Sequence, residues 1–189
     1  QRRLPLFFPM VSDQEHLRQS WISASDQLAA EVSKGNKVSF LCQGDVSLFA
    51  SSSYLLLELI HSHPECAVRL IPGVTSLAAA AAAGSWPLAL NDDRLLIAPT
   101  PNCSKDLEDL LAYTSSSGTV LALLKLGHRW EWVKPLLEEG DLLKDALFAE
   151  RLGWPDQKVL SANQVPARSR PYLSLLLVRH RWPKVVPNK

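Results

Sequence analysis

Residues 37–49 read KVSFLCQGDVSLF, a short apolar run followed by a Gly-Asp turn. The run Lys37–Cys42 is rich in apolar residues, which predicts a buried strand. Gly44 can adopt positive φ, and Asp45 can cap a helix predicted over Ser51–Ile60. Ligands of α/β sheets bind where the strands end, so this turn is a candidate site. An ordinary Gly-Asp turn would give the same pattern.

A similar pattern follows at residues 71–84, which read IPGVTSLAAAAAAG. The strand predicted over Ala67–Ile71 ends in a Pro-Gly turn. Thr75 or Ser76 can cap an alanine-rich helix that ends at Gly84, and the first N–H groups of that helix can face a ligand. Close packing of the helix on a sheet explains the alanines equally well.

The rest of the chain continues this alternation of helices and short apolar strands. Ser12 and Glu15 form a capping box, and apolar residues at helical spacing follow until Gly35. The remaining predicted elements are strand Arg94–Ala98, helix Ser104–Ala112, strand Thr119–Leu124, helix Trp130–Glu138, and strands Ala146–Glu150, Gln157–Ala162 and Tyr172–Val178. We expect an α/β fold with a mostly parallel first sheet and, because the last strands lack long helices between them, a mixed second sheet.

The composition argues against several classes of protein. Among the 189 residues, 20 Lys and Arg face 19 Asp and Glu, so no global field attracts nucleic acid or an anionic membrane. No apolar stretch is long enough to cross a bilayer. Cys42, Cys66 and Cys103 lack CxxC spacing, which argues against a disulfide framework or zinc site and favours a reducing, cytoplasmic environment. No other metal-binding pattern is found.

Two more turns follow predicted strands. Leu124 to Arg129 read LKLGHR and carry three potential cations, and Glu150 to Gly153 read ERLG. Each is a candidate binding loop. A solvated loop explains the first equally well, and a surface ion pair explains the second.

Together these segments resemble the tetrapyrrole methylases, two-domain enzymes that methylate corrin and sirohaem precursors with S-adenosylmethionine. The Gly44-Asp45 turn, Pro72–Ala83 and Trp86-Pro87-Leu88 occur in the order of that family. Within it, the chain is most similar to enzymes that methylate C20 of precorrin-2. The segments that carry this similarity are Phe8-Pro9-Met10, Phe49–Tyr54, Leu124–Gly127, Glu150-Arg151 and Pro171–Arg179.

Two departures from the family pattern stand out. The family begins with a strand and a glycine- and proline-rich loop of the cofactor pocket, which we expect this chain to lack. Val46 stands where the family has a proline after Gly-Asp. The resemblance implies two α/β domains, an incomplete cofactor-side domain at residues 1–89 and a second domain at residues 90–189.

The resemblance also implies the site residues. In the family the cofactor lies between the domains and is held largely by backbone groups. The implied cofactor-contacting residues are Gly44, Asp45, Val46, Thr75, Ser76, Leu124, Lys125 and Leu152. The substrate carries many carboxylates, which arginine forks suit best. The candidate substrate-binding residues are Arg129, Arg151, Arg168 and Arg170. The alternative interpretation of each is a solvated surface arginine. No catalytic base is assigned.

The implied reaction is methylation of precorrin-2 at C20 to give precorrin-3A in cobalamin biosynthesis, carried out by a homodimer. One alternative is the enzyme of the anaerobic route, which acts on cobalt-factor II. A second is a non-catalytic binding protein of the same fold. A nucleic-acid methylase of this fold is disfavoured, because the net charge is only +1.

Overall fold

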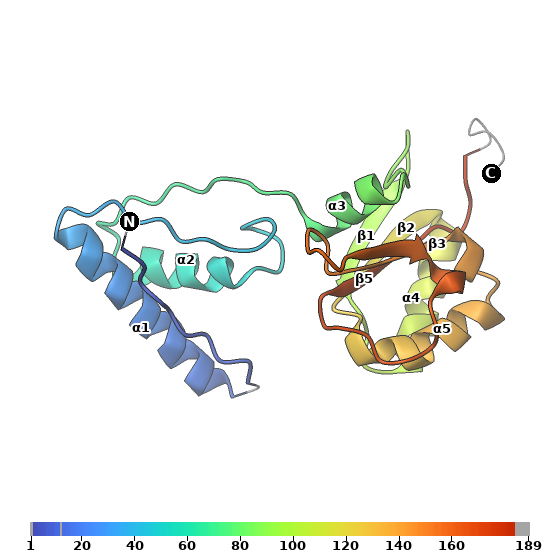
Figure 1. Cartoon of the computed structure of the whole chain (residues 1–189), viewed down its shortest axis with the longest axis horizontal. Coiled ribbons are helices and arrows are strands. Elements are labelled where there is room, and N and C mark those ends of the chain that lie inside the picture. Colours follow the sequence, from blue (N-terminus) through green and yellow to red (C-terminus); the bar gives the residue numbers. More distant parts are fainter. Residues whose placement is uncertain (1, 12, 184–189) are drawn as a thin grey trace. The chain divides into compact units, whose positions relative to one another are not determined.

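The computed structural model describes residues 2–11 and 13–183 of the chain. The described residues form two compact units, and the division between the units falls between Thr75 and Ser76 (Figure 1). The predicted domain boundary after Ala89 would place the alanine-rich helix in the first domain, whereas the compact units place it in the second. The division at residue 89 stays a prediction.

The first unit contains two helices, α1 (Gln14–Ser33) and α2 (Ser51–Ser62). Asp13 is the N-cap of α1, and its carboxylate accepts hydrogen bonds from the N–H groups at the start of the helix. The predicted cap, Ser12, lies outside the described residues. Gly35 follows the helix with a φ of 81°, which agrees with the predicted end of α1.

Aromatic side chains hold the first unit together around a small core. The ring of Trp21 stacks on Phe8 with 4.6 Å between centroids and on Tyr54 with 5.4 Å. Leu28 and Leu55 are buried beside them. These contacts join α1 to α2 and to the N-terminal segment.

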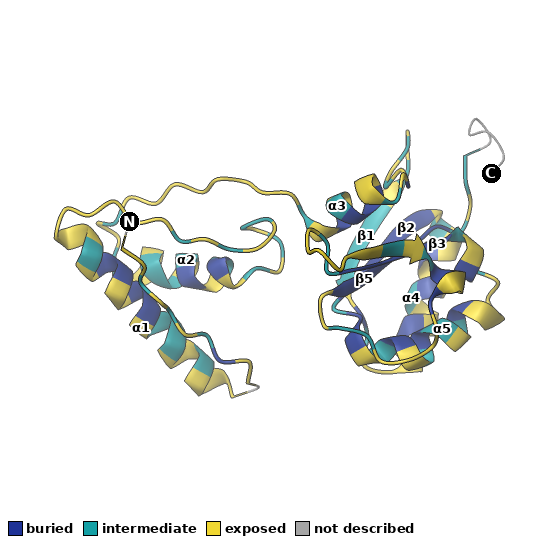
Figure 2. Ribbon diagram, viewed as in Figure 1, coloured by how far each residue is buried: buried dark blue, intermediate teal, exposed yellow. Residues whose placement is uncertain are grey.

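The two strands predicted for the first unit are not formed. Residues 37–42 and 67–71 are extended, but residues 2–11 and 13–75 contain no strand. Figure 2 shows both segments largely exposed; Leu41 is 88% exposed and Ile71 is 70% exposed. A strand needs a hydrogen-bonded neighbour, and neither segment has one here, so the prediction of a parallel sheet was wrong for the described residues.

The second unit contains a five-stranded mixed sheet, as predicted. Its strands are β1 (Arg94–Pro99), β2 (Thr119–Leu124), β3 (Ala146–Glu150), β4 (Lys158–Ser161) and β5 (Ser174–Val178). The spatial order is β1-β2-β5-β3-β4. β1 and β2 are parallel, whereas β5 lies between β2 and β3 and is antiparallel to both (Figure 1).

Helices cover both faces of this sheet. Its helices are α3 (Ser76–Ala83), α4 (Ser104–Ser117) and α5 (Trp130–Glu139), with short 3-10 helices at Gly127–Arg129, Leu143–Asp145 and Ala162–Gln164. Side chains of α4 and α5 form one core with alternate residues of the strands, including Phe148. The neighbouring residue, Leu147, faces the end of α3 at Gly84. β2, β3 and β5 are therefore buried along their whole length.

None of the described helices is both long enough and apolar enough to span a bilayer.

Candidate functional site

The Gly-Asp turn of the first unit is tied to the Pro-Gly turn. Gly44 has a φ of 82°, which a residue with a side chain rarely adopts. One carboxylate oxygen of Asp45, Oδ1, accepts hydrogen bonds from the Ser47 N–H at 2.9 Å and the Ser47 hydroxyl at 2.5 Å. The other, Oδ2, accepts the N–H of Gly73 at 2.9 Å. The hydroxyl and N–H of Ser47 and the N–H of Gly73 hold the pKa of Asp45 below its usual value.

The two turns also touch through their backbones. A Cβ atom built on Gly73 would lie 2.2 Å from the carbonyl oxygen of Gly44. Real Cβ contacts are never this short, so only glycine allows the approach at position 73. The sequence indicated a turn at each place, and the structure brings the two turns together.

Val46 connects the Gly-Asp turn to α2. Its carbonyl oxygen accepts hydrogen bonds from the hydroxyls of Ser52 at 2.9 Å and Ser53 at 3.1 Å. The N-cap of α2 is Ala50, and no side chain caps the helix there. The predicted capping of this helix by Asp45 was therefore wrong, because the carboxylate of Asp45 is used by Ser47 and Gly73.

Thr75 and Ser76 follow the Pro-Gly turn directly. Thr75 is the half-buried last residue of the first unit, and Ser76 is the exposed first residue of α3. Four predicted cofactor-contacting residues, Gly44, Asp45, Val46 and Thr75, thus lie in or beside the two linked turns of one unit.

The predicted residues of the second unit gather at one edge of its sheet. The carboxyl ends of β1, β2 and β3 meet there beside the beginning of β5, because Leu124 pairs with Leu175 and Glu150 with Ser174. The carbonyl oxygen of Leu124 accepts two hydrogen bonds from Thr100, one from its N–H at 2.7 Å and one from its hydroxyl at 2.9 Å.

The turn after β2 is held against the beginning of β5. Lys125 has a φ of 57° and Gly127 a φ of 53°, so the chain reverses sharply. Ser174 accepts two N–H groups of this turn: its carbonyl oxygen accepts that of Leu126 and its hydroxyl oxygen that of Gly127, each at 3.0 Å. The N–H of Arg170 donates to the carbonyl oxygen of Gly127 at 3.3 Å.

The turn after β3 begins at the same edge. Arg151 has a φ of 50°, and its N–H donates to the carbonyl oxygen of Leu173 at 2.8 Å. Leu152 follows and is half-buried. The structure thus brings the turns of Leu124, Lys125 and Leu152 to one edge, where ligands of α/β sheets collect.

A buried carboxylate lies beneath this edge. Glu150, only 2% exposed, accepts two hydrogen bonds from Arg170 on Oε2, from Nε at 2.9 Å and from Nη2 at 2.6 Å. Lys158 Nζ lies 3.0 Å from Oε1. Burial raises the pKa of Glu150, but Arg170 and Lys158 outweigh it, and the pKa lies below its usual value. Glu150 is therefore no exposed partner of Arg151, as a surface ion pair would require.

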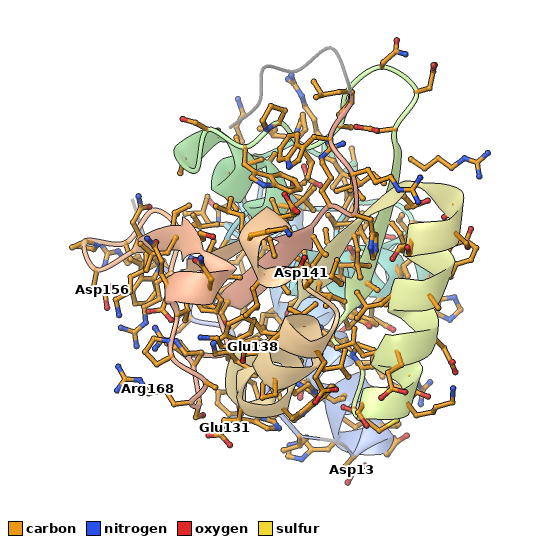
Figure 3. The ribbon with its side chains drawn as sticks, turned by 90° about the vertical axis from the view of Figure 1, so that its right-hand side faces the viewer. Asp13, Glu131, Glu138, Asp141, Asp156 and Arg168 are labelled. Atoms are coloured by element: carbon orange, nitrogen blue, oxygen red, sulfur yellow. The ribbon has the colours of Figure 1, made fainter. Side chains whose placement is uncertain are left out.

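The four candidate substrate arginines differ in how they are engaged. Arg170 is committed to Glu150, and Arg151 forms an ion pair with Asp156. Arg129 donates to the side-chain oxygen of Asn102 at 2.5 Å. Arg168 is exposed, and Figure 3 shows its side chain extending away from the ribbon.

Sequence reasoning missed the residues that hold these turns in place. Gly73 and Ser174 each contact a turn far away in the sequence. Glu150 ends the strand ALFAE, whose other four residues are apolar, and this pattern was the sequence signal that Glu150 is buried with the rest of the strand.

Comparisons with known proteins agree with this architecture. The family model described as "Tetrapyrrole (Corrin/Porphyrin) Methylases" matches residues 1–164. The chain is 31% identical over 177 residues to the cobalt-precorrin-2 C(20)-methyltransferase of Salmonella typhimurium, covering 93% of this chain and 72% of that protein. It is 24% identical over 183 residues to the precorrin-2 C(20)-methyltransferase of a Sinorhizobium species, with the same two coverages of 93% and 72%. The crystal structure of the methyltransferase CobJ superposes with a TM-score of 0.60 at 24% identity, covering 84% of this chain and 70% of that one.

Proposed function

Because this chain belongs to the tetrapyrrole (corrin/porphyrin) methylases, we propose that it methylates C20 of precorrin-2 with S-adenosylmethionine, giving precorrin-3A in cobalamin biosynthesis. The observation that carries methylation at C20 is the 31% identity over 177 residues to a cobalt-precorrin-2 C(20)-methyltransferase, and the 24% identity to a precorrin-2 C(20)-methyltransferase supports the metal-free substrate. A second candidate substrate is the cobalt-containing form, cobalt-factor II, because the relative from Salmonella typhimurium is named for a cobalt-precorrin.

In this proposal two groups of residues contact the cofactor. The first group consists of Gly44, Asp45, Val46 and Thr75 of the first unit, together with Ser76, which follows Thr75 as the first residue of α3. The second group consists of Leu124, Lys125 and Leu152 at the sheet edge of the second unit. Both groups lie in or beside turns, where backbone groups outside helices and strands can bind the polar atoms of a ligand.

The chemistry requires alignment more than catalytic side chains. A sulfonium methyl group is already activated, and the meso carbon of a reduced tetrapyrrole is electron-rich. The methyl group passes from sulfur to C20, S-adenosylhomocysteine leaves, and the meso proton goes to water or to a substrate carboxylate. Reacting atoms held about 3–3.5 Å apart in line account for much of the rate acceleration. We assign no general base.

Arg168 is the first candidate to bind a substrate carboxylate. Its guanidinium is exposed, whereas that of Arg170 is buried against Glu150. Arg129 ends the short 3-10 helix after β2, and Arg151 directly follows β3. We propose both as further contacts of the substrate. A planar fork that forms two hydrogen bonds suits a propionate or acetate side chain.

The test supplies the purified chain with S-adenosylmethionine and precorrin-2, either metal-free or loaded with cobalt. Mass spectrometry is expected to show a gain of one methyl group, and NMR to place it at C20. The substrate that is methylated faster shows whether the chain serves the metal-free or the cobalt-dependent route of cobalamin biosynthesis. A methyl group at another carbon, or none on either substrate, would contradict the proposal.

A non-catalytic binding protein of the same fold is the competing interpretation. Calorimetry with S-adenosylhomocysteine separates it from an enzyme, because a methyltransferase binds this product. No binding at millimolar ligand would favour the non-catalytic interpretation.

We also propose a homodimer, as the family resemblance implies. The apolar side chains of Leu57 and Ile60 on α2 are exposed, which is consistent with a protein interface. Light scattering that gives the mass of one chain would contradict this proposal.

A further inference from the structure

We infer that Asp45 is a positioning residue, which sets the distance between two turns of the first unit by holding the N–H of Gly73. This inference rests on the proposed function, since both turns belong to the proposed cofactor site. For Asp45 alone, it replaces the direct contact with the cofactor that the family resemblance implies and that the proposed function includes.

The hydrogen bonds of Asp45 carry the first step. Its carboxylate accepts three N–H or O–H donors, two from Ser47 and one from Gly73, which is 28 residues away. The bonds to Ser47 fix the orientation of the carboxylate within its own turn. The remaining bond then fixes the neighbouring turn, and charge-assisted bonds of this kind are the strong ones.

The close approach of the backbones carries the second step. The carbonyl group of Gly44 occupies the space where any other residue at position 73 would have its Cβ, 2.2 Å from the oxygen. The hydrogen bond to Asp45 therefore holds the two turns together, and the missing side chain at Gly73 allows them to meet. Removing the hydrogen bond at Asp45 or adding a side chain at position 73 should separate the two turns in the same way.

The far side of the Gly-Asp turn is also held. The hydroxyls of Ser52 and Ser53 both donate to the Val46 carbonyl oxygen and join the turn to the first residues of α2. With the turn held on both sides, a change at Asp45 is expected to act on the Pro-Gly turn and on Thr75, which follows it, rather than on α2.

The experiment compares four forms of the chain by calorimetry with S-adenosylhomocysteine: wild type, Asp45→Asn, Gly73→Ala and the double variant. An Asn side chain keeps the shape of Asp but replaces one acceptor oxygen by an NH₂ group, which cannot accept an N–H. Each single variant is expected to raise Kd about tenfold, as the loss of one charge-assisted hydrogen bond predicts. The double variant is expected to raise Kd no further, because both changes break the same link.

Additive effects in the double variant would show that Asp45 contacts the ligand directly and would overturn the inference. Wild-type affinity in Asp45→Asn would also overturn it. Gly140→Ala is the matched control, because its Cβ meets no atom closer than 3.5 Å. Absence of binding by the wild type would instead contradict the proposed function.

A readout without ligand tests the link itself. In the wild type, the amide NMR signal of Gly73 is expected to shift as Asp45 becomes protonated at acid pH, and this shift should be absent in Asp45→Asn. A Gly73 signal that does not respond to pH in the wild type would contradict the inference whatever the chain binds.

Discussion

Arg179 and Asp93, 86 positions apart in the sequence, form a buried ion pair with 2.6 Å between Nη1 and Oδ2. The guanidinium also donates to the carbonyl oxygen of Pro87 at 3.1 Å and lies over the rings of Trp86 and Trp182. This arginine follows the last strand and thereby anchors the segment that leads into the first strand of the sheet.

Arg179→Met is expected to lower the free energy of unfolding by about 3 kcal/mol, because it leaves a partly buried carboxylate without its partner. Urea denaturation measures the change. Arg94→Met, which removes an exposed arginine next to Asp93, is the control and should change stability by less than about 0.5 kcal/mol. Equal losses of unfolding free energy in the two variants would show that the ion pair of Arg179 and Asp93 does not stabilise the fold.

The pair of Glu150 and Arg170 predicts a pH dependence of stability. Because the pKa of Glu150 is below its usual value in the folded chain, its stabilising contribution is complete above the unfolded-state pKa of about 4.3. That contribution is lost as the pH falls through the lower pKa of the folded state. Glu150→Gln should make the free energy of unfolding depend less on pH below about pH 4.5.

Urea titrations at several pH values test this dependence, with Glu139→Gln as the control at an exposed carboxylate. At neutral pH, Glu150→Gln should also cost about 3 kcal/mol, since Arg170 stays buried without a charged partner. A wild-type slope that Glu150→Gln leaves unchanged would contradict this prediction.

Gly84→Ala should destabilise the second unit by about 1–3 kcal/mol through overpacking. A Cβ there would lie 2.6 Å from Cδ2 of Leu147 and 3.1 Å from Cγ1 of Val159. Leu147→Val removes volume at the point of contact and should restore part of the loss in a double variant. Thermal unfolding measures the stability of each form. A double variant as unstable as Gly84→Ala would show that the strain does not arise at Leu147.

Arg168→Ala should raise KM for the tetrapyrrole substrate about fivefold and leave the melting temperature unchanged. The guanidinium is exposed, so its contribution to substrate binding is that of a solvated ion pair, up to about 1 kcal/mol. Steady-state kinetics measure KM, and Arg18→Ala, an exposed arginine of α1, is the control. A fall in kcat with KM unchanged would contradict a binding role.

The sequence predicted the second unit well because its signals are local. Short apolar runs such as Thr119–Leu124 and helical spacing such as that of Trp130–Glu138 reappear as β2 and α5 almost unchanged. The runs Lys37–Cys42 and Ala67–Ile71 look similar, yet they form no strand. Pairing depends on a neighbouring segment, which no local pattern reveals.

The candidate site was predictable only as separate turns. Gly44 and Gly127 were recognised as turn residues, and both have positive φ. The link from Asp45 to Gly73 and that from Ser174 to Gly127 join residues far apart in the chain. Such contacts are decided by packing of the whole unit, so residue types at short spacing cannot specify them.

The central place of β5 has a consequence for synthesis on the ribosome. β2 and β3 are made first, yet each needs β5 as its hydrogen-bonded neighbour. Until residues 174–178 have left the exit tunnel, the edges of β2 (TVLALL) and β3 (ALFAE) that pair with β5 are unpaired, and every residue of these strands except Thr119 and Glu150 is apolar. Folding of the second unit therefore ends with the insertion of its last strand, and chaperones that bind extended apolar segments have their opportunity before that moment.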